Sequence, residues 1–211
     1  MTRPLLLVGM GSFWLVAYLL IISRGFRDRT FGMPVTALCA NISWEFVFSF
    51  LEPFPPALRA INGLWFTLDL IILYQVLRWG PDDFPNLQKR FFYAVFGVGL
   101  VTSFLTVFFM TRELPYRASY SAFAINLTMS VLFVAMLVRR RSLRGQSIWI
   151  GIAKMLGSLC ASLYFFLYFR SARDSVLLPF LGVSSFFVDV VYVLLLVFWD
   201  RLSHVVVTRA D

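Results

Sequence analysis

Long runs of apolar residues, separated by short polar segments, dominate the chain. Apolar positions within these runs do not alternate with polar ones, as they would in the half-buried elements of a soluble domain. Each run is about 20 residues long, the length that lets an α-helix cross the hydrocarbon core of a bilayer. We therefore predict seven transmembrane helices, over residues 5–23, 34–51, 60–77, 91–110, 120–138, 148–169 and 180–199.

The connections between the runs are too short to hold another folded domain. Residues 1–211 are therefore expected to form one all-α domain, a polytopic seven-helix transmembrane bundle. The first run is longer than the apolar part of a signal peptide, and the sequence SRGFRDR that follows it offers no small-residue cleavage site. We interpret residues 5–23 as the first membrane helix.

Basic residues are distributed unequally between the two sides of this predicted bundle. One side carries twelve of the 19 lysine and arginine residues, and the other carries six. The positive-inside rule then predicts an N-terminus outside and a C-terminus in the cytoplasm. A basic rim facing anionic lipid accounts for the net charge of +8, so no nucleic-acid partner is expected. Arginine supplies 17 of the 19 basic residues, a bias common in GC-rich genomes, which favours a bacterial cytoplasmic membrane.

Four ionisable residues lie inside the predicted spans: Glu45, Asp69, Lys154 and Asp189. A rise of 1.5 Å per residue places the three acids near one plane, close to the middle of the membrane. Because acids inside membranes are costly and usually functional, we predict one buried polar pocket that contains all three. Lys154 lies close to the cytoplasmic end of its span, where its amine is expected to snorkel to the interface.

Polar and aromatic residues accompany these acids at helical spacing. Asn41 precedes Glu45 by four residues, Trp65 precedes Asp69 by four, and Tyr192 follows Asp189 by three. Helix–helix hydrogen bonding is an alternative interpretation for single polar residues of membrane helices. The residues expected to bind substrate are Asn41, Trp44, Trp65, Asp69, Asn126, Phe186 and Tyr192.

A carboxyl group in a water-poor pocket keeps its proton and becomes an acid that can protonate an alkene or an epoxide. Aromatic side chains, 18% of the chain, could stabilise the resulting carbocation. The single histidine, His204, lies beyond the last span, so no metal site and no cofactor are predicted. The acidic sequence PDDFPN at residues 81–86 is interpreted as a solvated turn.

Three motifs resemble, in their order along the chain, a known family: NISWEF at residues 41–46, WFTLD at 65–69 and FFVDVVY at 186–192. The family is that of the small integral-membrane terpene cyclases of fungal meroterpenoid and indole-diterpene pathways, with their bacterial relatives. The resemblance covers the whole chain, since members are seven-span bundles of about this size.

The resemblance implies that Glu45 and Asp189 are the essential acids. Glu45 would be the general acid, and Asp189 a second acid, proton relay or final base. It also implies a lipophilic prenylated substrate, with a farnesylated indole or other aromatic as the leading expectation. An upstream prenyltransferase, and an epoxidase if the substrate is an epoxide, would supply it.

Other functions are compatible with the same residues. A proton-coupled small-molecule transporter would also use carboxylates in the middle of the membrane, and it is the main alternative. A retinal protein would have a lysine in the last helix, where this chain has Asp189. A scaffold or receptor without catalytic activity is the remaining interpretation.

Overall fold

The computed structural model describes residues 2–114, 117–199 and 201, and these contain helices and connecting segments but no strand. The predicted all-α fold is confirmed for this part of the chain. The elements are α1 (Thr2–Asp28), α2 (Val35–Phe46), the π-helix η1 (Val47–Leu51), α3 (Pro56–Trp79), the 3-10 helix η2 (Gly80–Asp83), α4 (Lys89–Glu113), α5 (Arg117–Arg140), α6 (Ile148–Tyr168), α7 (Arg170–Arg173) and α8 (Leu177–Val197).

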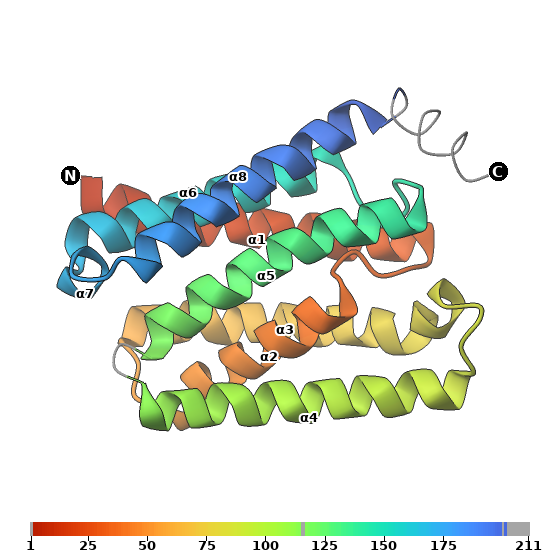
Figure 1. Cartoon of the computed structure of the whole chain (residues 1–211), viewed down its shortest axis with the longest axis horizontal. Coiled ribbons are helices and arrows are strands. Elements are labelled where there is room, and N and C mark those ends of the chain that lie inside the picture. Colours follow the sequence, from red (N-terminus) through yellow and green to blue (C-terminus); the bar gives the residue numbers. More distant parts are fainter. Residues whose placement is uncertain (1, 115–116, 200, 202–211) are drawn as a thin grey trace.

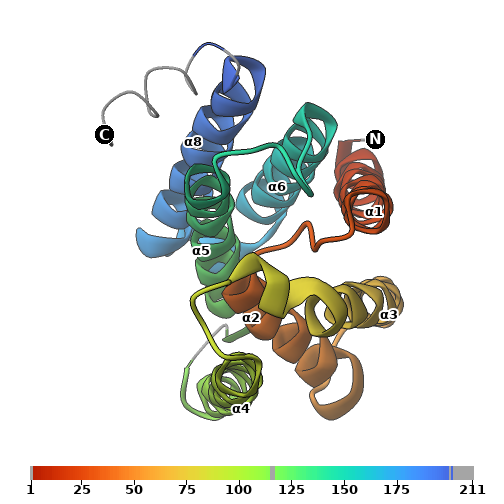
Figure 2. The same cartoon turned by 90° about the vertical axis from the view of Figure 1, so that its right-hand side faces the viewer.

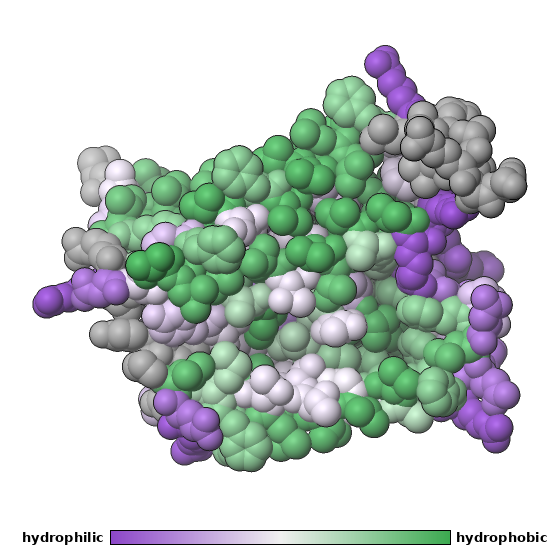
Figure 3. Space-filling view, in the orientation of Figure 1, coloured by the Kyte–Doolittle hydropathy of each residue, from purple (hydrophilic) through white to green (hydrophobic). Residues whose placement is uncertain are grey.

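In the part of the chain that the structure describes, six helices are long and apolar enough to cross a membrane: α1, α3 with η2, α4, α5, α6 and α8. The predicted span 34–51 forms a shorter apolar helix, Val35–Leu51, made of α2 and η1. Figure 3 shows a broad apolar surface with the most hydrophilic residues gathered at its two ends. Such an apolar belt fits a multi-pass membrane protein.

The helices form two groups, one of α1, α5, α6 and α8 and the other of α2, α3 and α4, and α2 contacts α5 of the first group. α1 packs extensively against α6, and α8 packs against α5 and α6, whereas α2 contacts α3, α4 and α5 (Figures 1 and 2). α1 also contacts α3, which closes the bundle on that side. A Cβ atom added at Gly157 of α6 would lie only 2.7 Å from Trp14 of α1, so glycine is needed there for the two helices to approach.

The π-helix η1 follows α2 directly and begins two residues after Glu45. Its wider turn is marked by the hydrogen bond from the Glu52 amide to the Val47 carbonyl, 2.9 Å. Pro53 and Pro55 then prevent the helix from continuing. A π-turn beside a buried acid is notable because such turns are frequent at functional sites.

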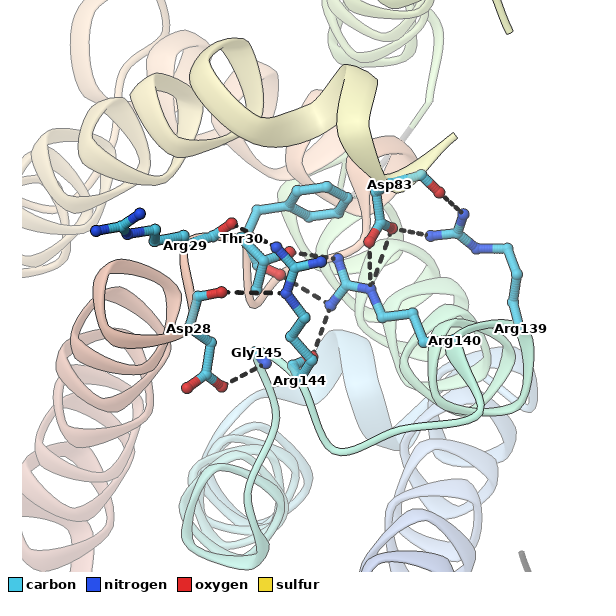
Figure 4. A network of polar contacts seen from close by, with 9 residues as sticks. Asp28, Arg29, Thr30, Asp83, Arg139, Arg140, Arg144 and Gly145 are labelled. Carbon is cyan, nitrogen blue, oxygen red and sulfur yellow. Dashed lines mark hydrogen bonds and ion pairs between the residues drawn. The ribbon is translucent and has the colours of Figure 1, made fainter. Parts of the chain in front are cut away.

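One end of the bundle, which we call the basic end, carries the connections at residues 29–34, 80–88 and 141–147. An arginine clamp made of Asp83, Arg139 and Arg140 joins these connections (Figure 4). Arg140 Nε lies 3.1 Å from Asp83 Oδ2, and Arg140 Nη1 donates to the Phe31 carbonyl at 3.0 Å. The Asp83 side chain is 7% exposed, so the interpretation of residues 81–86 as a merely solvated turn is wrong for this aspartate.

The connection after α5 is held against the end of α1 by hydrogen bonds between side chains and backbone. Arg144 Nη2 donates to the Arg29 carbonyl at 2.7 Å, and the Gly145 amide donates to Asp28 Oδ2 at 2.9 Å (Figure 4). Gly145 has φ of +75°, and a Cβ atom there would lie 2.7 Å from the Phe31 carbonyl oxygen. Glycine is required by both the backbone angle and the close approach.

Candidate active site

Two buried carboxyl groups, Glu45 of α2 and Asp69 of α3, are joined through one amide. The Asn41 Nδ2 atom lies 2.8 Å from Glu45 Oε1 and 2.9 Å from Asp69 Oδ2. Tyr18 of α1 completes this acid cluster: its hydroxyl donates to Glu45 Oε1 at 2.7 Å and lies 2.6 Å from Asn41 Nδ2. An amide nitrogen carries two hydrogens, so the three acceptors around Asn41 share them. The cluster therefore fixes the relative position of three helices.

Each acid of the cluster keeps one oxygen without a hydrogen-bond partner among the described residues, Glu45 Oε2 and Asp69 Oδ1. Glu45 is 2% exposed and Asp69 is 0% exposed. Neither forms an ion pair with a lysine or arginine in the part of the chain that the structure describes. Two uncompensated acids in an apolar bundle are energetically costly, which indicates a use other than stability.

Glu45 lies on the wall of a cavity of about 410 Å³. The cavity is enclosed by α1, α2, α3, α5 and α6 and by the segment that contains Phe54 and Pro55, at the end of the bundle opposite the basic end. Its other walls are mostly apolar, with aromatic side chains from Trp14, Trp44, Phe54, Trp65, Phe123, Phe165 and Phe169. The cavity can therefore hold an elongated apolar molecule against Glu45.

The structure brings five of the predicted site residues together on the cavity wall: Asn41, Trp44, Glu45, Trp65 and Asn126. Trp44 is oriented by a hydrogen bond from its Nε1 to Ser121 Oγ, 2.9 Å. Asp69 does not line the cavity, but it contacts Asn41 from behind the wall. The predicted site residues of α2 and α3 thus lie together, on the cavity wall or directly behind it.

Asp189 lies apart from this site, so the expectation that all three acids share one pocket is wrong. Its Oδ1 forms an ion pair with Lys154 Nζ at 2.6 Å, and each of the two side chains is 1% exposed. Lys154 also donates to Ser130 Oγ at 2.6 Å. The expectation that Lys154 snorkels is therefore also wrong, because its amine is paired inside the bundle. Asp189 is absent from the cavity wall because α8 packs against the far sides of α5 and α6.

The buried ion pair lies about one helical turn from the cavity, toward the basic end. Asn126 and Ser158 line the cavity and share a hydrogen bond of 3.1 Å. Ser130 follows Asn126 by four residues on α5, and Lys154 precedes Ser158 by four on α6. Ser130 and Lys154 thus connect Asp189 to residues of the cavity floor.

Two other predicted site residues do not line the cavity either. Tyr192 is fully buried, and its hydroxyl donates to Gln146 Oε1 at 2.9 Å, near the basic end. Phe186 packs against Phe187, which is exposed on the outer face of α8. Both belong to the same helix as Asp189 and are displaced from the cavity with it.

Sequence reasoning did not identify Tyr18, Asn62 or Ser158 as site residues. Asn62 could have been found, because it precedes Asp69 by seven residues and therefore lies on the same face of α3. Tyr18 and Ser158 carry no such signal, since their role depends on which helices are neighbours.

The sequence matches the Pyr4-like transmembrane terpene cyclases over residues 2–202. The Pyr4-family terpene cyclase mfmH of Annulohypoxylon moriforme is 31% identical over 166 aligned positions, which cover 76% of this chain and 68% of that protein. Terpene cyclase penB of Penicillium crustosum is 32% identical, with 72% of this chain and 65% of that protein covered. Terpene cyclase pyr4 of Aspergillus fumigatus is 29% identical, with 94% and 87% covered. No solved protein structure matches the chain.

The matched range includes all seven predicted helices. The three relatives are fungal, so they give no support to the expected bacterial membrane. Their names agree with the family that the three motifs at residues 41–46, 65–69 and 186–192 resemble, and the resemblance is confirmed. The chain belongs to the Pyr4-like transmembrane terpene cyclases.

Proposed function

We propose that this chain is a membrane-integral cyclase that starts cyclisation of a prenylated substrate by donating a proton from Glu45. The observation that carries the proposal is the position of Glu45: a buried acid, without a cationic partner among the described residues, on the wall of an aromatic cavity. Membership in a terpene cyclase family favours this enzyme over the proton-coupled transporter.

The hydrogen bonds around Glu45 support its use as an acid. Oε1 accepts hydrogen bonds from Tyr18 and Asn41, while Oε2 has no partner among the described residues. In a protonated Glu45 the hydrogen would lie on Oε2, where no acceptor of the described residues takes it, and it would be available for transfer to a bound substrate. Asn41, held in turn by Asp69, would keep the acid in this orientation.

The proposed reaction needs no atoms other than those of the substrate and one catalytic proton. Glu45 transfers the proton to the terminal alkene, which leaves a cation on the neighbouring carbon, or to the epoxide oxygen, whose bond to carbon then breaks and leaves a hydroxyl group. The electron pair of the next double bond attacks the electron-deficient carbon and closes the ring. The cation moves along the chain as further rings form, and a base removes a proton at the end. Trp44 and Trp65 would stabilise the cations through their ring faces and exclude water.

Asp189 would act indirectly in this proposal. Its ion pair with Lys154 reaches Ser130 and, one turn away, Asn126 at the cavity floor. We propose one of two roles for this ion pair. It relays the proton that is removed from the substrate at the end of cyclisation, or it keeps the residues of the cavity floor in place. Direct contact of Phe186 or Tyr192 with substrate has less support, because neither lines the cavity.

Several finer features remain part of the proposal. The chain would form one seven-span domain with its N-terminus outside and the basic end in the cytoplasm, as the distribution of arginines favours. A farnesylated aromatic would be supplied by a prenyltransferase and, for an epoxide substrate, by an epoxidase. The arginine bias alone supports a bacterial cytoplasmic membrane as the location.

Cyclisation in heavy water tests the proposal. Membranes containing the protein should convert a farnesylated aromatic with a terminal alkene into a product of unchanged mass but different retention time. In D2O that product should gain one deuterium at a carbon atom, because the initiating proton comes from an exchangeable acid. Recovery of the substrate unchanged, or a cyclised product without deuterium, would count against the mechanism.

A further inference from the structure

Two fully buried hydrogen-bond donors, Asn62 Nδ2 and Trp65 Nε1, belong to residues that line the cavity and have no partner among the described residues. Asn62 is 1% exposed and is one of the residues that line the cavity. Trp44, which lines the cavity from α2, differs, because its Nε1 already donates to Ser121. Buried donors without acceptors are unfavourable, and their presence beside an empty space indicates a ligand that satisfies them.

The two donors lie on the same face of α3, three residues apart. α3 begins at Pro56, at the cavity's outer end, and Asn62 precedes Asp69 by seven residues. Seven residues of α-helix span about 10 Å. Because Asp69 is linked through Asn41 to Glu45, Asn62 lies about two helical turns, and Trp65 about one helical turn, outward from the level of the acid.

We propose that Asn62 and Trp65 bind an acceptor oxygen on the head group of the substrate and thereby select which head groups are cyclised. This proposal rests on the proposed function, in which the prenyl end of the substrate lies against Glu45. The polar head group of the substrate would then lie nearer the cavity's outer end, at the level of the two donors. Asn62 is a positioning and specificity residue here. Trp65 would have this role through its Nε1, in addition to the role of its ring face toward the cations.

The chemistry of Trp65 defines the class of head group. An indole nitrogen only donates a hydrogen bond, so its partner has to be an acceptor such as a carbonyl, enolate or phenol oxygen. A plain indole head group has an N–H but no acceptor oxygen, and it would leave Trp65 unsatisfied. The donor pair therefore favours an oxygen-bearing aromatic head group over the farnesylated indole expected from the sequence.

Binding measurements can separate this proposal from catalysis. The Glu45→Gln protein in lipid nanodiscs would be titrated with farnesylated acetophenone and with farnesylated ethylbenzene, its analogue without the oxygen. Trp65→Phe keeps the aromatic face and removes the donor, and Asn62→Leu removes the amide at similar size. Each substitution should weaken binding of the ketone about five- to tenfold, the effect of one hydrogen bond, and leave binding of the ethylbenzene analogue unchanged.

Three results would overturn the proposal: equal weakening of both ligands, no weakening of either, or no detectable binding of the ketone to the Glu45→Gln protein. Farnesylated indole provides a third ligand, whose affinity should not respond to Trp65→Phe. Because no turnover is involved, failure of the cyclisation test with the unmodified protein would be a separate result. If Trp65→Phe and Asn62→Leu have the same effect on binding, a folding defect in one of the two variants does not explain the result.

Discussion

Lys154 and Asp189 form an ion pair of 2.6 Å inside the bundle, with each side chain 1% exposed. Removing one partner of a buried pair leaves an uncompensated charge, which typically costs about 3–5 kcal/mol. Lys154→Met and Asp189→Asn should each lower the free energy of unfolding by about that amount, measured by denaturant titration in detergent. The double variant should lose less than the sum of the two single losses. Strictly additive losses would show that the pair is not coupled.

Tyr18 is predicted to position the catalytic acid through its hydroxyl, which donates to Glu45. Tyr18→Phe keeps the ring and removes this hydrogen bond, so kcat should fall about tenfold while the amount of folded protein in membranes stays the same. Tyr74→Phe is the matched control, because Tyr74 is exposed on α3 and away from the cavity. Equal activity of the Tyr18→Phe and Tyr74→Phe variants would contradict the positioning role of Tyr18.

Trp44 is predicted to protect cationic intermediates, since its ring lies on the wall beside Glu45. Trp44→Ala removes a cation–π contribution of about 0.5–2 kcal/mol and opens space for water. We expect lower turnover and the appearance of products heavier than the substrate by one water molecule, detected by mass spectrometry. Trp149→Ala, at an exposed position on α6, should leave the product pattern unchanged. A Trp44→Ala product pattern identical to that of the unmodified protein would contradict the assigned role.

The arginine clamp is predicted to stabilise the fold without taking part in the chemistry. The Arg140 side chain is 4% exposed and contacts Asp83, which is 7% exposed. Arg140→Ala leaves Asp83 with only the more exposed Arg139, so the free energy of unfolding should fall by about 3 kcal/mol. The neighbouring Arg141→Ala, at an exposed position, should change it by less than about 0.5 kcal/mol. Activity per folded molecule should remain the same in both variants.

The helices could be predicted from sequence because a membrane imposes a length on each apolar run. α4, for example, spans Lys89–Glu113 where residues 91–110 were predicted, and it is longer only because helical hydrogen bonds continue into the charged ends. The π-helix after Glu45 was not predicted. Its wider turn begins at Val47 without a proline or glycine inside it, so no local residue signal marks it.

The candidate site was predictable where its residues share a helix, and less so where they come from different helices. Asn41 and Glu45 are one turn apart on α2, so spacing alone indicated their contact. Depth along the helix axis placed Asp189 at the level of Glu45, but depth does not tell which helices are neighbours. The partner of Asp189 proved to be Lys154, whose position near a span end suggested the interface instead.

The most direct test of the account is turnover by Glu45→Gln, which keeps the size of the side chain and removes the acid. Glu113→Gln provides the matched control, because Glu113 is exposed at the end of α4. Both variants would be assayed in membranes with the substrate that the unmodified protein cyclises, alongside a binding measurement. The account predicts that Glu45→Gln binds the substrate but forms no detectable cyclised product, whereas Glu113→Gln retains full activity. Full turnover by Glu45→Gln would contradict the assignment of Glu45 as the proton donor.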